Sequence, residues 1–225
     1  MTTAPAPALK RRICPACLRP GSTCICAWIT PTATAVEVVI LQHPLEVGNA
    51  KGSARLLHLS LPNSRLLIGD VFEVAALQAL LAQSPRRAIL LYPDTPKDQS
   101  PDLSPPPVLS PDDVCDPSAI RLIVLDGTWR KSRKMLYQNP LLQQLPRLAL
   151  RDMPTSHYLI RKAHLPDQLS TLEATCAALM QLEGQVLPLQ PLLTAFDGFV
   201  AQQLGYRKKQ KVRSFANQTD WGIQQ

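Results

Sequence analysis

The chain has 225 residues, of which 45% are hydrophobic and 18% charged, and its formal net charge is +7. This composition excludes a wholly disordered protein, and the length suits one domain with a small appendage that folds without disulfides. The sequence contains no apolar run of about 18 residues and no secretory signal at its N-terminus. We therefore expect a cytoplasmic protein with no membrane partner.

Hydrophobic periodicity predicts strands that alternate with helices along most of the chain. Three of these strands, 36–41, 87–92 and 120–125, are nearly all apolar, as expected for strands buried on both faces. In chain order, the expected elements are strand 36–41, helix 53–59, strand 65–68, helix 71–82, strand 87–92, strand 120–125, helix 129–138, short strands 147–151 and 157–161, helix 171–183 with a Ser170–Glu173 capping box, and helix 189–204. This alternation is typical of an α/β domain with a largely parallel sheet flanked by helices.

The segment 93–117 interrupts this pattern with eight prolines, six aspartates and one lysine. Proline lacks a backbone donor and breaks helices and central strands, so we expect a long surface loop that holds neither. Its local charge of −5 leaves +12 on the rest of the chain. The loop is interpreted either as an insertion without a role or as a lid.

Positive charge gathers in four groups along the chain. Such a distribution suits the phosphates of a nucleic acid, while the aromatic content of only 5% argues against extensive base stacking. The groups are Lys10, Arg11, Arg12 and Arg19; Arg130, Lys131, Arg133 and Lys134; Arg147, Arg151, Arg161 and Lys162; and Arg207, Lys208, Lys209, Lys211 and Arg213.

Four of the six cysteines are close together near the N-terminus, at Cys14, Cys17, Cys24 and Cys26. A reducing compartment disfavours disulfides, so this density indicates a metal site, and four thiolates suit a closed tetrahedral Zn²⁺ site of structural role. The alternatives are an iron–sulfur cluster, a redox pair, or cysteines without metal. The neighbouring Arg11, Arg12 and Arg19 are expected to favour the thiolate forms.

A second candidate site follows the third buried strand. Asp126 stands at its carboxyl end, where ligands bind in open α/β sheets, and Gly127 permits a close approach of the backbone. Thr128 suits a helix N-cap, and Trp129 offers a flat face to the core or to a heteroaromatic ring. Purely structural roles would also explain these residues. Asp126 would then be a turn residue, Thr128 a helix cap and Trp129 a side chain of the core. The basic residues that follow on the next helix favour a site facing nucleic acid.

Several motifs, taken in their order, resemble those of the DTW-domain family, in particular its bacterial tRNA-uridine aminocarboxypropyltransferases. The resemblance covers roughly residues 11 to 207. The Asp-x-Thr-Trp signature alone is short, but the ordered set is specific. The motifs are Arg12 with the four cysteines, His43–Glu46, Leu91–Pro93, Leu125–Trp129, Lys134–Met135, Pro140, Leu145–Pro146 and Ser170–Ala174.

The resemblance implies a SPOUT-related fold with a knotted cofactor site. It also implies that S-adenosylmethionine donates a 3-amino-3-carboxypropyl group to N3 of a uridine in tRNA, which leaves 5′-methylthioadenosine. On this basis the chain is divided into a zinc-binding segment (1–30), a catalytic domain (31–207) and a basic C-terminal tail (208–225).

Asp126 is the candidate for the general base that accepts the N3 proton; alternatively it holds the ammonium group or a ribose hydroxyl of the donor. Thr128 and Trp129 are the other catalytic candidates, one to orient a ligand and the other to line or support the adenosine pocket. The donor site is expected to comprise Leu91, Tyr92, Pro93, Leu125, Asp126, Gly127, Thr128 and Trp129. The tRNA-binding residues are expected to be Arg130, Lys131, Arg133, Lys134, Arg207, Lys208 and Lys209.

Two other functions stay open on the sequence. One is an S-adenosylmethionine-dependent RNA methyltransferase on the same fold, which would release S-adenosylhomocysteine instead. The other is a non-catalytic, zinc-containing RNA-binding protein. The sequence has no glycine-rich phosphate-binding loop and no hydrolase nucleophile elbow, so common nucleotide-dependent and serine-hydrolase chemistry is disfavoured.

Overall fold

The computed structural model describes residues 12–83, 85–93, 105–150, 169–184 and 187–219, with the backbone alone for 187 and 207–219. The strands are β1 (Glu37–Gln42), β2 (Ser64–Ile68), β3 (Arg87–Leu91), β4 (Ile120–Asp126) and β5 (Arg147–Leu148). The α-helices are α1 (Ala54–Ser60), α2 (Val74–Ala82), α3 (Trp129–Gln138), α4 (Pro140–Gln143), α5 (Thr171–Glu183) and α6 (Gln190–Thr219). Short 3₁₀ helices are η1 (Gly21–Thr23), η2 (Cys26–Trp28), η3 (Pro44–Glu46), η4 (Pro111–Val114), η5 (Pro117–Ala119) and η6 (Leu187–Leu189).

All neighbouring strands of the sheet run parallel, in the order β2-β1-β4-β3-β5. The chain leaves β1 towards β2 but leaves β4 towards β5 on the other side, so its direction switches between β1 and β4. Such a switch point forms a crevice beyond the carboxyl ends of the two strands, where α/β proteins bind ligands. In the β1–β4 register Gln42 lies beside Asp126, so both strands end here in a polar residue.

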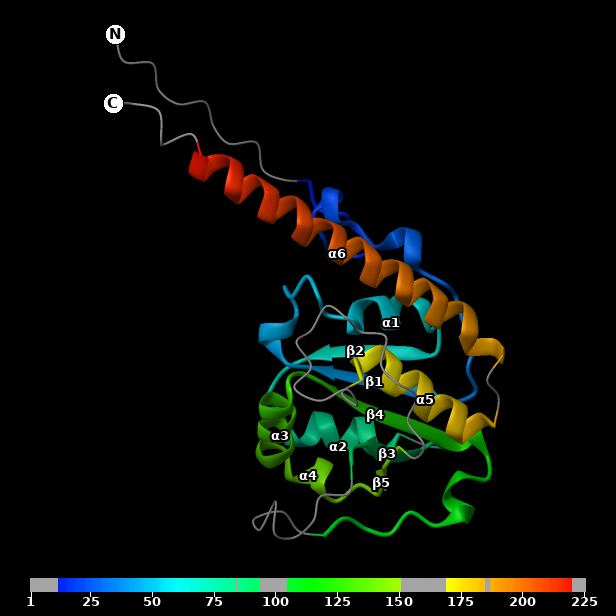
Figure 1. Ribbon diagram of the computed structural model, residues 1–225. Helices are drawn as coiled ribbons and strands as arrows, with labels where there is room; N and C mark the ends of the chain where they lie inside the picture. Colours follow the sequence, from blue (N-terminus) through cyan, green and yellow to red (C-terminus); the bar gives the residue numbers. More distant parts are fainter. Residues whose placement is uncertain (1–11, 84, 94–104, 151–168, 185–186, 220–225) are drawn as a thin grey trace.

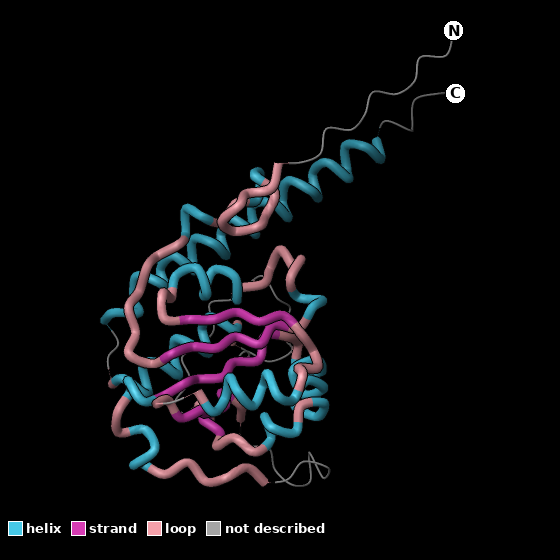
Figure 2. The backbone as a smooth tube through the Cα atoms, turned by 180° about the vertical axis from the view of Figure 1, so that it is seen from behind, coloured by secondary structure: helices cyan, strands magenta, loops and turns pink. Residues whose placement is uncertain are grey.

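Alternate side chains along the strands bury two cores, one on each face of the sheet. Val38 and Ile40 of β1 pack on the face covered by α1, α5 and α6. Val39 and Leu41 pack on the other face, under α2, α3 and α4. Figure 1 shows these two helical layers, and Figure 2 shows the strands side by side between them. Because both faces are covered, the middle of each central strand is apolar on both faces, and the polar residues Glu37, Gln42, Arg121 and Asp126 lie near the strand ends.

The predicted α/β class, with a parallel sheet flanked by helices and an N-terminal cysteine cluster, is confirmed. The strands and helices within the described residues lie close to their expected bounds, and the expected strand at 147–151 is the two-residue β5. The expected strand at 157–161 lies outside the described residues. The SPOUT relationship with its knot, and the division of the chain at residues 30 and 207, stay predictions.

Helix α6 is longer than expected, because it continues to Thr219 instead of ending at 204. Gly205 resembles a helix end signal, but the lysines, arginines and glutamines after it are strong helix formers and sustain the helix. In Figure 1 the last turns of α6 extend away from the rest of the molecule. Among the described residues, no helix is apolar enough over a sufficient length to span a membrane.

The end of the Pro-rich segment departs from the expected loop without helices, since it contains η4 and η5. Both begin with proline, whose fixed φ suits the first helical position, and the side chains of Ser110 and Asp116 cap them. Arg87 at the start of β3 forms an ion pair with Asp113 of η4. The backbone N–H of Ser110 and this arginine lower the pKa of Asp113, against a smaller opposing effect of burial. Proline and aspartate therefore promote short capped turns here.

The N-terminal cysteine segment packs along α6 rather than standing apart. Cys17 and Ile25 are buried in the core beneath α1, α5 and α6. Trp28 donates from its indole nitrogen to Oε1 of Gln202 at 3.0 Å. A Cβ at Gly198 would lie 2.2 Å from the Trp28 ring, so only glycine lets α6 approach the indole this closely. The N-terminal segment is thus packed against the middle of the C-terminal helix α6.

A buried ion-pair network around Glu37 closes the amino end of the sheet. Arg121, only 2% exposed, donates from Nε to Oε2 of Glu37 at 2.7 Å and from NH1 to two carbonyls at the end of α2. The Nε of Arg65 lies 3.0 Å from Oε1 of Glu37, and the Nε of Arg86 lies 3.7 Å from Oε2. One carboxylate therefore joins β1, β2 and β4 at the end opposite the switch point.

We predict that Glu37→Ala lowers the free energy of unfolding by about 3–5 kcal/mol, because it leaves the buried Arg121 guanidinium without its carboxylate. Urea unfolding monitored by circular dichroism measures this. Asp113→Ala, which removes an ion pair with the half-exposed Arg87, is the matched control and should cost at most about 1 kcal/mol. Equal losses in the two variants would contradict a stabilising role for the Glu37 network.

Candidate functional site

Asp126 ends β4 at the switch point, with 5% of its surface exposed. Gln42, at the end of β1, donates from Nε2 to Oδ2 of Asp126 at 2.8 Å. The hydroxyl of Thr171 donates to Oδ1 at 2.7 Å. Neutral donors from a neighbouring strand and from α5 therefore fix the orientation of this carboxylate at the carboxyl edge of the sheet.

The start of α5 is determined by its own sequence. Ser170 caps the helix by accepting from the backbone N–H of Glu173 at 3.2 Å, and the Glu173 carboxylate accepts from the N–H of Ser170 at 2.8 Å. The predicted capping box is therefore confirmed. It places Thr171 in the first turn of α5, where the positive end of the helix dipole favours the Asp126 carboxylate.

The turn from β4 into α3 is tight. A Cβ at Gly127 would lie 3.1 Å from the Cβ of Lys131 and 3.8 Å from that of His43, so the glycine permits the close approach. The N–H of His43 donates to the carbonyl of Asp126 at 3.0 Å, which extends the β1–β4 pairing into the turn. Thr128 is exposed and accepts from the N–H of Lys131 at 3.4 Å, as the N-cap of α3. Its hydroxyl therefore has a capping role, and any role toward a ligand stays a prediction.

An aromatic pair lies on the α3 side of the sheet. Trp129, 54% exposed, contacts Tyr92 edge to face, with 5.7 Å between ring centroids and 82° between planes. Tyr92 is buried, and the guanidinium of Arg147 lies 5.3 Å from its ring centroid. Burial raises the pKa of Tyr92, and the positive charges of Arg147 and Arg133 oppose this effect. Trp129 is thus a surface residue with a supported ring, not the buried core side chain of the structural interpretation.

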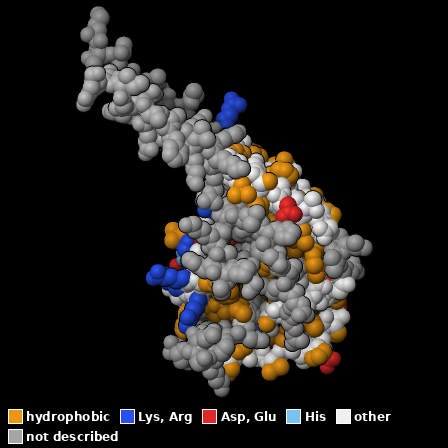
Figure 3. All heavy atoms as spheres, viewed as in Figure 1, with side chains coloured by type: hydrophobic (Ala, Val, Ile, Leu, Met, Phe, Trp, Pro, Cys, Tyr) orange, Lys and Arg blue, Asp and Glu red, His pale blue; other side chains and the backbone are white. Residues whose placement is uncertain are grey.

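The basic residues of α3 fall into two kinds. Arg130, Arg133 and Lys134 are exposed, and Figure 3 shows Lys and Arg side chains gathered on this side of the molecule. Lys131 instead extends to Glu46 after β1, with 2.8 Å between Nζ and Oε1, and Glu46 is only 3% exposed. Lys131 therefore links the two loops that border the crevice, which a prediction based on positive charge alone did not reveal.

The remaining predicted site residues lie along the same edge or outside the described side chains. Leu91 and Leu125 are half-buried at the ends of β3 and β4, and Pro93 is exposed. Three predicted RNA-binding residues lie in the part of α6 whose side chains are not described, namely Arg207, Lys208 and Lys209.

The four predicted cysteine ligands come together, with all four Sγ atoms within 4.8 Å of one another. Cys14 and Cys26 lie 3.6 Å apart, and Cys17 and Cys24 lie 3.7 Å apart. Zn–S bonds of about 2.3 Å in a tetrahedron place sulfur atoms about 3.8 Å apart, so the donor set and spacing fit a zinc ion. The group is therefore able to hold a metal.

The thiols of this group differ in acidity. Backbone N–H groups of Cys17 and Ala16 lower the pKa of Cys14 to about 6. Burial is the largest effect on Cys17 and raises its pKa, but backbone N–H groups outweigh it and the net shift is downward. Burial and the neighbouring thiols raise the pKa of Cys26 to about 12. Backbone N–H groups lower the pKa of Cys14 and of Cys17, while the expected effect of nearby arginines stays a prediction. A cation is needed for all four thiolates to coexist.

Gln42 and Thr171 are the site residues that sequence reasoning missed as such. The signal that could have identified Gln42 is its polar side chain at the end of a buried, largely apolar strand. Thr171 belongs to the predicted capping box and to the Ser170–Ala174 motif, neither of which assigns its hydroxyl a partner. Neither signal indicates Asp126 as the common partner, since that contact depends on how strand and helix pack.

Comparison with known proteins identifies similar sequences over most of the chain. The DTW domain model matches residues 11–204. A tRNA-uridine aminocarboxypropyltransferase 2 from Drosophila melanogaster is 30% identical over 206 residues, 88% of this chain and 77% of that protein. The protein of the same name from Mus musculus is 29% identical over 200 residues, 87% of this chain but 64% of its own length. A tRNA-uridine aminocarboxypropyltransferase A from Arabidopsis thaliana is 32% identical over 139 residues, 56% of this chain and 51% of its own. No solved structure matches the chain.

We predict that the purified protein carries about one metal ion per chain, and that Cys14→Ser removes it. The loss should lower the free energy of unfolding by about 4 kcal/mol, since a metal bound only by the folded chain stabilises the fold directly. Metal analysis by mass spectrometry and urea unfolding measure the two effects. Cys115→Ser, at an exposed cysteine outside the cluster, is the control and should change neither. Metal-free wild-type protein of full stability would contradict the assignment.

We predict that Thr171→Val lowers the free energy of unfolding by about 1–3 kcal/mol, because it leaves one oxygen of the buried Asp126 without its donor. Thr194→Val is the control. Thr194 is an exposed residue whose hydroxyl donates to the carbonyl of Gln190 within α6, so its loss should change stability little. Chemical denaturation of both variants measures the difference. A Thr171→Val variant as stable as wild type would show that the contact contributes nothing to the fold.

Proposed function

This chain belongs to the DTW-domain family, and on that premise we propose that it is a tRNA-uridine aminocarboxypropyltransferase. It transfers the 3-amino-3-carboxypropyl group of S-adenosylmethionine to N3 of a uridine in tRNA. The observation that carries the proposal is the orientated carboxylate of Asp126 at the switch point, within the Asp-x-Thr-Trp signature of a chain similar to enzymes of that name. A tRNA substrate also favours a cytoplasmic location.

The proposed reaction balances without a redox partner. The new bond joins uridine N3 to Cγ of the methionine part, while the Cγ–S bond breaks and its electron pair stays on sulfur. The sulfonium becomes the neutral thioether of 5′-methylthioadenosine, and the N3 proton leaves to solvent or to a base. Selection of Cγ over the methyl group depends on which carbon is held in line with N3, at about 3–3.5 Å.

Asp126 suits the holding of the donor more than the removal of a proton. Its two oxygens accept from Gln42 and Thr171, so its orientation is fixed, and the N-terminus of α5 beside it favours a negative charge. A fixed carboxylate of this kind binds an ammonium group or a ribose hydroxyl well. Asp126 thereby orients Cγ of the donor toward N3 of the uridine. Gln42 and Thr171 in turn position Asp126.

We assign roles to the other residues near the carboxyl edge of the sheet according to their exposure to solvent. Leu91, Leu125 and Gly127 lie at the carboxyl edge of the sheet and contact the donor. The exposed Arg130, Arg133 and Lys134 bind phosphates of the tRNA. Arg207, Lys208 and Lys209 of the C-terminal sequence are assigned to further phosphates of the tRNA.

The cysteine group holds a structural Zn²⁺. Four sulfur donors close the coordination shell and leave no position for water, so the ion supplies stability and no step of the reaction. Trp28 and Gln202 fix the metal segment against α6. The ion thus stabilises the start of α6, which carries the C-terminal basic residues.

We predict that the protein with S-adenosylmethionine and tRNA from cells lacking it yields 3-(3-amino-3-carboxypropyl)uridine and 5′-methylthioadenosine in equal amounts. Asp126→Asn should raise the donor KM roughly 10- to 100-fold, since it removes one charge-assisted contact. Mass spectrometry of nucleosides and small products measures both. Asp112→Asn, an exposed residue of η4, is the control.

Other outcomes have distinct meanings. Release of S-adenosylhomocysteine would identify a methyltransferase, and absence of any product would leave an RNA-binding protein. If Asp126→Asn lowers kcat, keeps the donor KM and abolishes the dependence of kcat on pH, Asp126 is the general base instead.

A further inference from the structure

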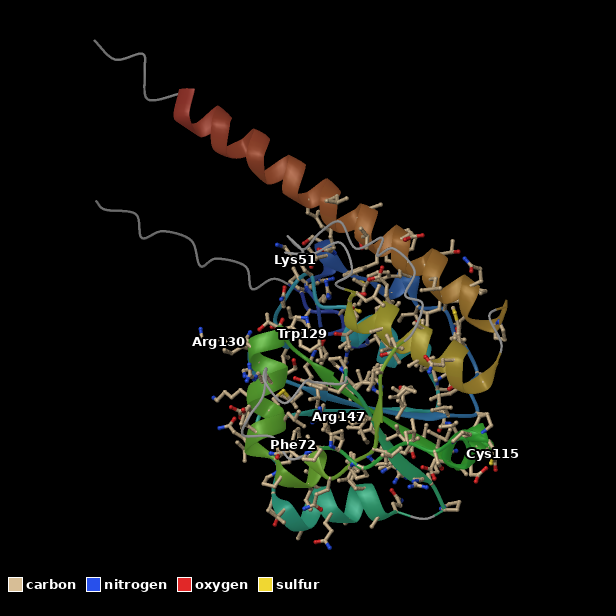
Figure 4. The ribbon with its side chains drawn as sticks, turned by 60° about the horizontal axis from the view of Figure 1, so that its bottom comes forward. Lys51, Phe72, Cys115, Trp129, Arg130 and Arg147 are labelled. Atoms are coloured by element: carbon tan, nitrogen blue, oxygen red, sulfur yellow. The ribbon has the colours of Figure 1, made fainter. Side chains whose placement is uncertain are left out.

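Trp129 is unusual among the large apolar side chains of the described residues, because its ring is both exposed and supported. With 54% of its surface accessible, the indole offers an apolar face to solvent at the first turn of α3. Figure 4 shows Trp129 beside Arg130, with Lys51 on the nearby loop. Burying this face would be favourable for any ligand with a flat apolar surface.

The support beneath Trp129 restricts its motion. Tyr92 meets the indole edge to face, and the Tyr92 ring is itself fixed by burial and by the Arg147 guanidinium 5.3 Å from its centroid. A ring held in place in this way loses little conformational freedom when a second ring stacks on it, so more of the stacking energy becomes binding energy. The stack is therefore preorganised for a flat partner.

Trp129 and Asp126 belong to opposite sides of the sheet. Asp126 is bonded to Thr171 of α5, whereas Tyr92, the support of Trp129, is buried in the core beneath α2, α3 and α4. The depth also differs, because Asp126 is 5% exposed and Trp129 is 54% exposed. A donor held at the deep carboxylate does not need the outer ring, which leaves that ring to a ligand arriving from solvent.

The charges around Trp129 indicate the class of that ligand. Arg130 is exposed next to it, and Arg133 and Lys134 follow one turn along α3. An exposed aromatic ring beside cations is how proteins bind unpaired nucleotides, with the base on the ring and the phosphate on the cations. We propose that Trp129 stacks on a nucleobase of the tRNA and is a substrate-specificity residue, not part of the donor pocket.

This inference rests on the proposed function, and the chemistry of uridine supports it. N3 is on the Watson–Crick edge, so a uridine must be unpaired before N3 can react. An unpaired base loses stacking with its neighbours, and an aromatic side chain replaces that stacking. Trp129 thereby favours unpaired uridine or the base next to it, and discriminates against duplex RNA.

The test separates RNA affinity from donor affinity. Trp129→Ala should weaken binding of tRNA from cells lacking the protein by roughly 5- to 100-fold, the range for loss of one stacked base. Trp129→Phe should retain most of the affinity, and the donor Kd should stay at the wild-type value in both. Val74→Ala, at an exposed apolar residue on α2, is the control and should change neither affinity.

Fluorescence gives a readout that altered folding would not imitate. Oligouridylate should quench the tryptophan emission of wild-type protein, and a fully paired RNA of equal length should quench it less. The oligouridylate quenching should be lost in Trp129→Phe, which keeps a stacking ring but removes the indole. Loss of donor affinity in Trp129→Ala, with RNA affinity unchanged, would overturn the proposal.

The two proposals fail separately. If wild-type protein forms no aminocarboxypropyl product but Trp129→Ala still weakens RNA binding, the stacking inference holds and the proposed reaction is wrong. If product forms normally and Trp129→Ala leaves the KM for tRNA unchanged, the reaction stands and the stacking inference is wrong.

Discussion

A buried carboxylate at the switch point of the sheet determines the arrangement of the site. Asp126 accepts hydrogen bonds from Gln42 and Thr171, which come from another strand and from the first turn of α5. Because a charge this deep is costly without partners, the packing of β1, β4 and α5 must supply them. The same contacts that satisfy the carboxylate also fix its direction, so the crevice is organised before a ligand enters.

The two ends of the sheet use buried charge differently. At the amino end, the carboxylate of Glu37 is shared by guanidinium groups, a pairing that cross-links strands. At the carboxyl end, the amide of Gln42 and the hydroxyl of Thr171, both neutral groups, donate to Asp126 and orientate its carboxylate.

The cysteine segment connects the beginning of the chain to its end. Trp28 fits against Gly198 and bonds to Gln202, so the metal segment and α6 stabilise each other. Short-range geometry within the segment brings four sulfurs together, while its position depends on contacts with a helix far along the sequence. The cysteine segment thereby packs against a long helix whose last turns extend from the molecule.

The sequence by itself determined the class of fold, the cysteine group and the turn that holds Asp126. Apolar periodicity, ligand spacing and turn residues are local patterns, and each of these features is local. Only the tertiary structure decided that Gln42 and Thr171, 84 and 45 residues from Asp126, hold its carboxylate. It also decided that Lys131 pairs with Glu46, 85 residues away, instead of facing solvent with its neighbours. Such pairings follow from strand order and helix packing, which no window of neighbouring residues encodes.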